Sequence, residues 1–178
     1  MRAVFLDRDA TVTVGVPKYE RVDSLDKVEL LPNTLQALEV LANLDFMVFL
    51  VTNQAGLAEG LITEQDFNTI NAKVLELIAP SGVQVIKTYV CPHGEQSDCD
   101  CRKPKPKMLL DAAHEYDIEL SQSYMIGDRH SDVMTGINAG TQTIFVKTGN
   151  VTEDYDLATY NAPSLLEAIE YIAKTEKF

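Results

Sequence analysis

The chain has 178 residues, 46% of them hydrophobic, and no tract long enough to cross a bilayer, so we expect one soluble domain over residues 1–178. Its formal charge of −12, from 15 basic and 27 acidic residues, argues against nucleic acid as a partner but leaves room for a small anion in a locally basic pocket. Met1-Arg2-Ala3 leads directly into an apolar stretch, which leaves no room for a signal peptide and predicts a cytoplasmic protein without membrane contact.

The first predicted strand, residues 2–6, ends in two carboxylates. Side chains alternate along a strand, so Asp7 and Asp9, two positions apart, are expected to face the same space. Two acids at the end of a buried strand pack poorly, but they can bind a divalent cation, and one of them can act as a nucleophile. Residues 12–31 then show no sustained period. We expect a flap loop, too short to be a separate cap domain, and therefore a fairly open site.

Strands and helices alternate along the rest of the chain. The predicted strands cover residues 46–51, 83–90, 124–126 and 143–146, and the predicted helices begin near Pro32 and Thr63 and cover 107–116, 133–139 and 163–173. This order implies an α/β fold, a three-layer doubly wound parallel sheet with helices on both faces. Sites in such sheets lie at the carboxyl ends of the strands. The residues expected to meet there are Asp7, Thr52, Lys103 and Asp128.

Three cysteines and a histidine gather within eleven residues. Cys91-x-His93 and Cys99-x-Cys101 supply three thiolates and an imidazole, a complete tetrahedral set for a structural Zn²⁺. We expect the zinc loop, about residues 91–103, to hold the basic residues that follow it against the cleft. Two prolines stiffen that basic run, residues 102–107, which predicts an anion-recognition element.

The order Asp7-x-Asp9, Thr52, Lys103 and Gly127-Asp128-x-x-x-Asp132 resembles the haloacid dehalogenase (HAD) superfamily of phosphatases, subfamily IIIA. The likeness covers essentially the whole chain up to the last predicted strand. It implies an enzyme, a phosphoric monoester hydrolase with a Rossmann-like core and no cap domain. It also implies that Asp7 attacks phosphorus to give an aspartyl-phosphate, and that Asp9 protonates the leaving alcohol and then activates water.

Phosphoryl transfer explains why these residue types are present. A carboxylate attacks an anionic phosphoryl group only if a cation and fixed donors neutralise the charge. Mg²⁺ prefers oxygen ligands, here the carboxylates of Asp7 and Asp128 and the main-chain carbonyl of Asp9. We expect Asp132 to orient its neighbours rather than to bind the metal. The residues predicted to bind the phosphate or the substrate are Arg8, Thr52, Asn53, Arg102 and Lys103.

Two substrates compete. The zinc loop resembles that of phosphatases for histidinol phosphate and for D-glycero-D-manno-heptose 1,7-bisphosphate. The stretch from Thr11 to Pro32, with Val22-Asp23-x-x-Asp26-Lys27, and the short span between His93 and Cys99 favour histidinol phosphate and a role in histidine biosynthesis. Residues 52–60 and 124–128 are at least as similar to the heptose enzymes. We expect histidinol phosphate, with the heptose bisphosphate as the alternative.

Two further alternatives come from other functional classes. A nucleic-acid end-processing phosphatase shares the catalytic core, but the acidic charge and the lack of an aromatic and basic stripe argue against it. A zinc-stabilised binding module without catalysis would need a broken catalytic set, and here every acid and the lysine are present. A monomer and a small homo-oligomer both fit the sequence.

One position departs from the pattern of the related phosphatases. They usually carry glycine where this chain has Ala10. If the backbone there has a positive φ angle, alanine costs roughly 1 kcal/mol. No reacting group would be lost, but the flap or the activity would be affected.

Overall fold

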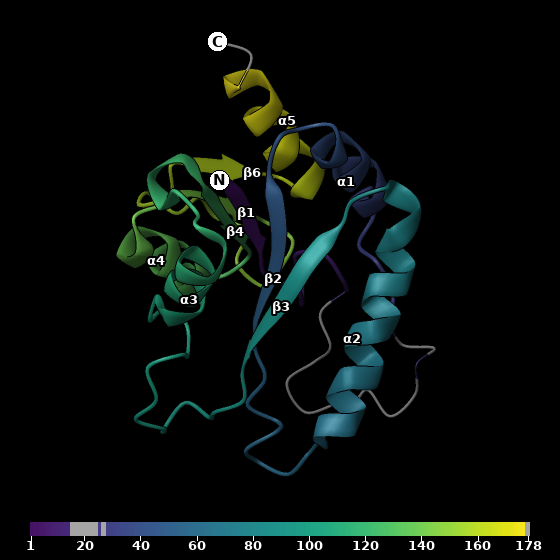
Figure 1. The fold of residues 1–178 in the computed structure, drawn as a ribbon, viewed down its shortest axis with the longest axis vertical. Coiled ribbons are helices and arrows are strands. Elements are labelled where there is room, and N and C mark those ends of the chain that lie inside the picture. The colour runs from purple at the N-terminus through teal and green to yellow at the C-terminus, as the bar shows by residue number, and fades with distance from the viewer. Residues whose placement is uncertain (15–24, 26–27, 177–178) are drawn as a thin grey trace.

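The computed structural model describes residues 1–14, 25 and 28–176, and it contains a six-stranded sheet in the order β3-β2-β1-β4-β5-β6 with every neighbouring pair parallel (Figure 1). The strands are β1 (Ala3–Leu6), β2 (Met47–Asn53), β3 (Val85–Cys91), β4 (Tyr124–Gly127), β5 (Gln142–Val146) and β6 (Tyr160–Ala162). The helices are α1 (Thr34–Ala42), α2 (Glu64–Ile78), α3 (Lys107–Tyr116), α4 (His130–Ala139) and α5 (Leu165–Thr175), with short 3₁₀ turns η2 (Ala79–Ser81) and η3 (Leu120–Gln122).

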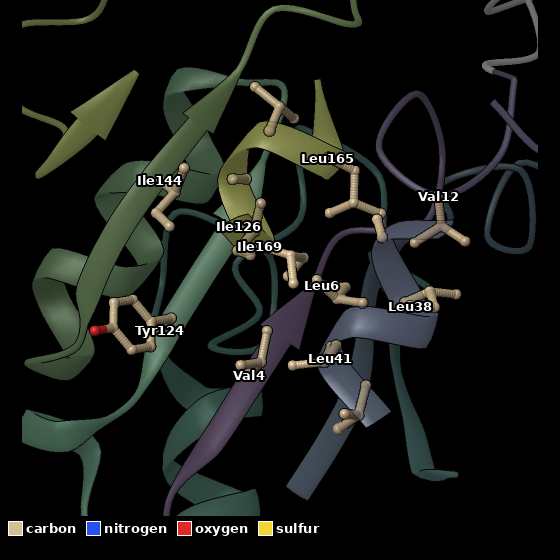
Figure 2. Close-up of a cluster of buried hydrophobic side chains, with 14 of the residues drawn as sticks. Val4, Leu6, Val12, Leu38, Leu41, Tyr124, Ile126, Ile144, Leu165 and Ile169 are labelled. Atoms are coloured by element: carbon tan, nitrogen blue, oxygen red, sulfur yellow. The ribbon is translucent and has the colours of Figure 1, made fainter. Parts of the chain in front are cut away.

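The alternation of side chains along β1 divides the core into two layers. Val4 and Leu6 point to one face of the sheet, where Figure 2 shows them packed against side chains of α1 and α5. Ala3 and Phe5 point to the other face, into the cluster that contains Leu109 of α3. All four strand residues are buried, so β1 is covered on both sides. The predicted three-layer parallel architecture is therefore confirmed.

Most predicted elements are present, with shifted ends that have local causes. α3 covers the predicted residues. α2 begins beside Thr63, as predicted, at a capping box in which Thr63 and Asp66 each accept a hydrogen bond from the other's backbone N–H. α4 begins at His130, three residues before the predicted start, because the Asp132 carboxylate accepts the backbone N–H of Arg129. Short β6 was not predicted.

The helix predicted near Pro32 begins later than expected. Thr34 is the first residue of α1, and Asn33 precedes it with a left-handed φ of 63°. Pro32 therefore lies before the helix and not in its first turn. Asparagine is one of the few residues other than glycine that tolerate this conformation, so the sequence contained a signal for a turn at this point.

The two ends of the flap are joined to each other. Thr13 forms an isolated antiparallel bridge with Leu30, and the backbone N–H of Val14 donates to the carbonyl of Glu29 at 2.9 Å. The Val22 to Lys27 segment that favoured histidinol phosphate lies outside the described residues, apart from Leu25. No separate cap is present in the part of the chain that the structure describes.

The carboxyl ends of the strands lie at one edge of the sheet. In Figure 1 the loops that leave β2 and β3 extend together toward the bottom of the picture, before the chain turns back into α2 and α3. Among the described residues, no helix has both the length and the apolar composition that crossing a bilayer requires.

Candidate active site and zinc cluster

A buried lysine connects three elements at this edge of the sheet. The Lys103 ammonium, in the loop after β3, lies 2.6 Å from Oδ1 of Asp7 and 2.6 Å from Oδ1 of Asp132. It also donates to the carbonyl of Val51 at 3.1 Å, and its side chain is only 3% exposed. The loop after β3 thus places a fixed positive charge between the acids that follow β1 and begin α4.

Burial and mutual repulsion dominate the electrostatics of these acids. Burial raises the pKa of Asp7 well above its usual value, and Lys103 only partly offsets this because Asp132 is also close. Burial and Asp132 likewise raise the pKa of Asp128. Burial would lower the pKa of Lys103, but Asp132 and Asp7 raise it above its ordinary value. The lysine stays charged, but the three acids in their ionised forms would carry more negative charge than this one lysine balances, and their pKa values rise for that reason.

The donor set fits a divalent cation. Carboxylate oxygens of Asp7, Asp128 and Asp132 all lie within 4.8 Å of one another. These three buried carboxylates face one ammonium group, so a doubly charged cation would restore neutrality. Each oxygen of Asp132 already has one partner, Lys103 or the N–H of Arg129, so the protein itself holds this carboxylate in place. The assignment of Asp7 and Asp128 as the side chains that bind the ion stays a prediction.

Glycine is required where the chain passes closest to this cluster. A Cβ atom on Gly149, in the loop after β5, would lie 1.9 Å from Oδ2 of Asp128. One on Gly127 would lie 2.4 Å from the Asp132 side chain. The backbone therefore packs directly against the acids and fixes their position.

Asp9 is held by donors from the protein and is not buried with the other acids. Its carboxylate accepts both Nε and Nη2 of Arg8, at 3.2 and 3.1 Å, and the Thr52 hydroxyl at 3.3 Å. Gln54 Nε2 donates to it at 2.7 Å. Desolvation would raise the pKa of Asp9, but the Arg8 charge and these hydrogen bonds hold it below its usual value. Its side chain is 33% exposed, whereas that of Arg8 is 5% exposed.

Two other predicted phosphate ligands make their contacts within the protein. Asn53 holds the backbone of Lys103 at two points, accepting its N–H at 3.1 Å and donating to its carbonyl at 3.3 Å. Arg102 donates to the carbonyl of His93 at 3.0 Å and lies 3.6 Å from the Glu95 carboxylate. Both residues fix the loop that carries Lys103, and their contact with phosphate stays a prediction.

Sequence reasoning assigned no role to three residues that contact the site. Gln54 binds Asp9, the Thr11 hydroxyl lies 3.4 Å from Oδ1 of Asp128, and the Thr148 hydroxyl donates to the Ala10 carbonyl at 2.5 Å. Gln54 and Thr148 both follow predicted strands, so the same rule that selected Thr52 could have found them. Thr11 directly precedes the unpatterned flap and gave no such signal.

The cysteine and histidine cluster is assembled as predicted. The ligand atoms of Cys91, His93, Cys99 and Cys101 all lie within 4.8 Å of one another, with the Nδ1 atom of His93 3.3 Å from the Cys101 sulfur. Desolvation would raise the pKa of Cys99, but the backbone N–H of Arg102 helps to lower it to about 7. A thiolate is therefore accessible near neutral pH. Three sulfurs and one imidazole match the composition of a tetrahedral zinc site.

Known proteins resemble this chain along nearly its whole length. A family model described as HAD-hydrolase-like matches residues 100–170. The chain is 35% identical to the D-glycero-β-D-manno-heptose-1,7-bisphosphate 7-phosphatase of Pasteurella multocida, over 99% of this chain and 97% of that protein. It is 34% identical to the enzyme of the same name from Escherichia coli K12, over 98% of this chain and 95% of that protein.

A solved structure agrees with these relatives. The D,D-heptose 1,7-bisphosphate phosphatase of B. bronchiseptica, complexed with magnesium and phosphate, superposes with a TM-score of 0.89 at 33% identity and covers 98% of this chain and 99% of that one. These relatives favour the heptose alternative over histidinol phosphate, and they give no support to a role in histidine biosynthesis. The chain is a phosphoric monoester hydrolase with a HAD core that lacks a cap, and it belongs to the D,D-heptose 1,7-bisphosphate phosphatase family of HAD-like phosphatases.

Proposed function

We propose that this phosphatase removes the 7-phosphate of D-glycero-β-D-manno-heptose 1,7-bisphosphate. The observation that carries the proposal is the full-length similarity to 7-phosphatases of that name. The substrate is a small, doubly phosphorylated sugar, which suits a site without a cap and with a buried lysine at its base.

In this proposal Asp7 is the nucleophile. Its carboxylate attacks the phosphorus, the bond from phosphorus to the sugar oxygen breaks, and a phosphoryl group remains on Asp7. Lys103 stabilises the charged form of Asp7 and donates to the phosphoryl oxygens. The Thr52 hydroxyl, whose single proton points to Asp9 in this structure, would turn to donate to them when substrate binds. Mg²⁺, bound by Asp7, Asp128 and the main-chain carbonyl of Asp9, would supply the charge neutralisation that phosphoryl transfer requires.

Asp9 moves the protons. It gives a proton to the departing sugar oxygen and then takes one from the water that attacks the phosphorylated Asp7. That second attack releases inorganic phosphate and restores the Asp7 carboxylate. The partly exposed position of Asp9, beside the buried nucleophile, supports this division of roles because a proton donor must reach the leaving group.

Steady-state kinetics with Mg²⁺ test the substrate. We expect kcat/KM for the heptose 1,7-bisphosphate to exceed that for histidinol phosphate by at least about tenfold, which corresponds to about 1.4 kcal/mol of transition-state binding. The released phosphate should come from position 7, as product analysis by ³¹P NMR would show. A tenfold preference for histidinol phosphate would contradict the proposal.

We also propose that the cysteine and histidine cluster binds one structural zinc ion, since all four ligands come from the protein and leave no open position for water. Metal analysis of freshly purified protein is expected to give about one zinc per chain. Substantially less zinc in a folded, active enzyme would contradict this assignment.

A further inference from the structure

We propose that Arg8 and Gln54 are positioning residues that fix the Asp9 carboxyl group so that its Oδ1 atom exchanges the proton with the leaving group. This inference rests on the proposed function, in which Asp9 is the acid and base. It assigns Arg8 a role different from the phosphate contact predicted from sequence.

The hydrogen bonds on Asp9 are unequally divided between its two oxygens. Oδ2 accepts three donors, Arg8 Nη2 at 3.1 Å, Gln54 Nε2 at 2.7 Å and the Thr52 hydroxyl at 3.3 Å. Oδ1 accepts one, Arg8 Nε at 3.2 Å. A carboxylate oxygen has two lone pairs, so among the described contacts Oδ2 is saturated and Oδ1 keeps a lone pair free. Oδ1 is therefore the atom able to carry a proton.

The surroundings of Arg8 fix its side chain, so that it can hold the Asp9 carboxylate in one orientation. The Arg8 side chain is 5% exposed, and its guanidinium carbon lies 5.4 Å from the centre of the Phe67 ring. Its own carbonyl accepts the N–H groups of Val12 and Thr13, both at 3.0 Å, so its backbone is fixed as well. A two-point contact between a guanidinium and a carboxylate sets the plane of the carboxylate, which a single charge cannot do. The buried arginine thus determines the direction in which Oδ1 points.

Gln54 supplies the second restraint. The same Nε2 atom lies 2.7 Å from Asp9 Oδ2 and 2.8 Å from the Thr52 hydroxyl, and it therefore links the acid to the end of β2. Gln54 belongs to the turn after β2, whereas Asp9 follows β1. The acid is held from two neighbouring strand ends, and rotation about its side-chain bonds would break contacts to both.

The test uses two variants and two leaving groups. Gln54→Met keeps the length of the side chain but removes the donor, and Arg8→Lys keeps the charge but removes the two-point contact. For the heptose bisphosphate, whose alkoxide leaving group needs a proton, we expect each variant to lower kcat at least about tenfold while KM changes by less than about threefold, since general acid catalysis contributes 10²–10⁴-fold. For p-nitrophenyl phosphate, whose leaving group needs no proton, kcat/KM should fall less than about threefold.

Controls separate this inference from the proposed function. Asp9→Asn should show the same dependence on leaving group, with a larger loss. Gln36→Met, an exposed substitution in α1, should behave like wild type. If Asp9→Asn lowers the rate with both substrates equally, the proton-transfer role of Asp9 is wrong. If Asp9→Asn behaves as expected but folded Arg8→Lys and Gln54→Met retain wild-type kcat, or lose activity through KM alone, the positioning role is overturned while the proposed function stands.

Discussion

Replacing Ala10 by glycine should stabilise the protein. Ala10 has a φ of 62°, in the left-handed region where the Cβ atom of an L-residue crowds its own backbone at a cost of about 1–2 kcal/mol. Glycine avoids that cost but loses about 0.5–1 kcal/mol more chain entropy on folding. The contacts of the Ala10 backbone with Thr13 and Thr148 do not involve its side chain and should persist.

The difference gives a net stabilisation of about 0.5–1 kcal/mol for Ala10→Gly, equivalent to a rise in Tm of about 1–4 °C for a chain of this size. Urea unfolding at saturating Zn²⁺ and Mg²⁺ measures it, because fixed metal concentrations remove differences in ligand binding. The matched control is Ala72→Gly in the middle of α2, an exposed helical alanine where the same chemical change should destabilise by about 1 kcal/mol.

The sign of the change is the decisive result. If Ala10→Gly lowers the free energy of unfolding as Ala72→Gly does, then the left-handed backbone at position 10 stores no strain, and our reasoning is refuted. Opposite signs for two identical substitutions would show that backbone conformation, not side-chain loss, controls both effects.

Further predictions concern the site. Asp7→Asn should lower kcat more than about 10³-fold with Tm within about 5 °C of wild type, and a rate near that of wild type would exclude Asp7 as the nucleophile. Asn53→Ala removes two contacts with the Lys103 backbone and should cost about 1–2 kcal/mol in urea unfolding and reduce kcat; unchanged kcat would show that the Asn53 contacts are not needed for catalysis. Removing zinc with a chelator and then restoring Mg²⁺ should lower Tm and raise KM, and an unchanged KM would separate the zinc loop from substrate binding. Because the pKa values of Asp7 and Asp128 are raised, the metal-free site retains protons that Mg²⁺ must displace, so Mg²⁺ affinity measured by calorimetry should increase as pH rises from about 5.5 to 7.5; pH-independent affinity would contradict this.

The positions of the clustered acids were predictable because a topological rule located them. Asp7 and Asp128 directly follow buried apolar runs, and parallel strands bring such positions to one edge of the sheet. Lys103 was found by the same rule, even though eleven residues separate it from Cys91, the last β3 residue that pairs with β2 in the sheet. The hydrophobic pattern shows where each strand ends, and therefore the sequence alone predicts which of these acids and basic residues meet at the edge of the sheet.

The orientation of polar side chains could not be predicted in the same way. Nothing in the sequence distinguishes an Arg8 that faces phosphate from one that turns back onto its neighbour Asp9, because that choice depends on packing against Phe67, which is distant in the chain. Asn53 likewise follows a strand, as expected, but its amide binds the Lys103 backbone. β6 was missed because three residues are too few for a period to show.

Because Lys103 follows the edge strand β3, phosphatase activity should require that this strand has joined the sheet. The ion pair between Lys103 and Asp7 joins residues 96 positions apart in the chain. Lys103 also pairs with Asp132, in the first turn of α4, and α4 follows β4, which is separated from β3 in the sheet by β2 and β1. An intermediate that had formed β1, β4 and β5 but had not yet added the outer strand β3 would contain the acids without their cation. Such a species would already have much of its core and still be inactive. During refolding, recovery of phosphatase activity should therefore follow the docking of β3 and never precede it, so that turnover reports on the docking of this edge strand.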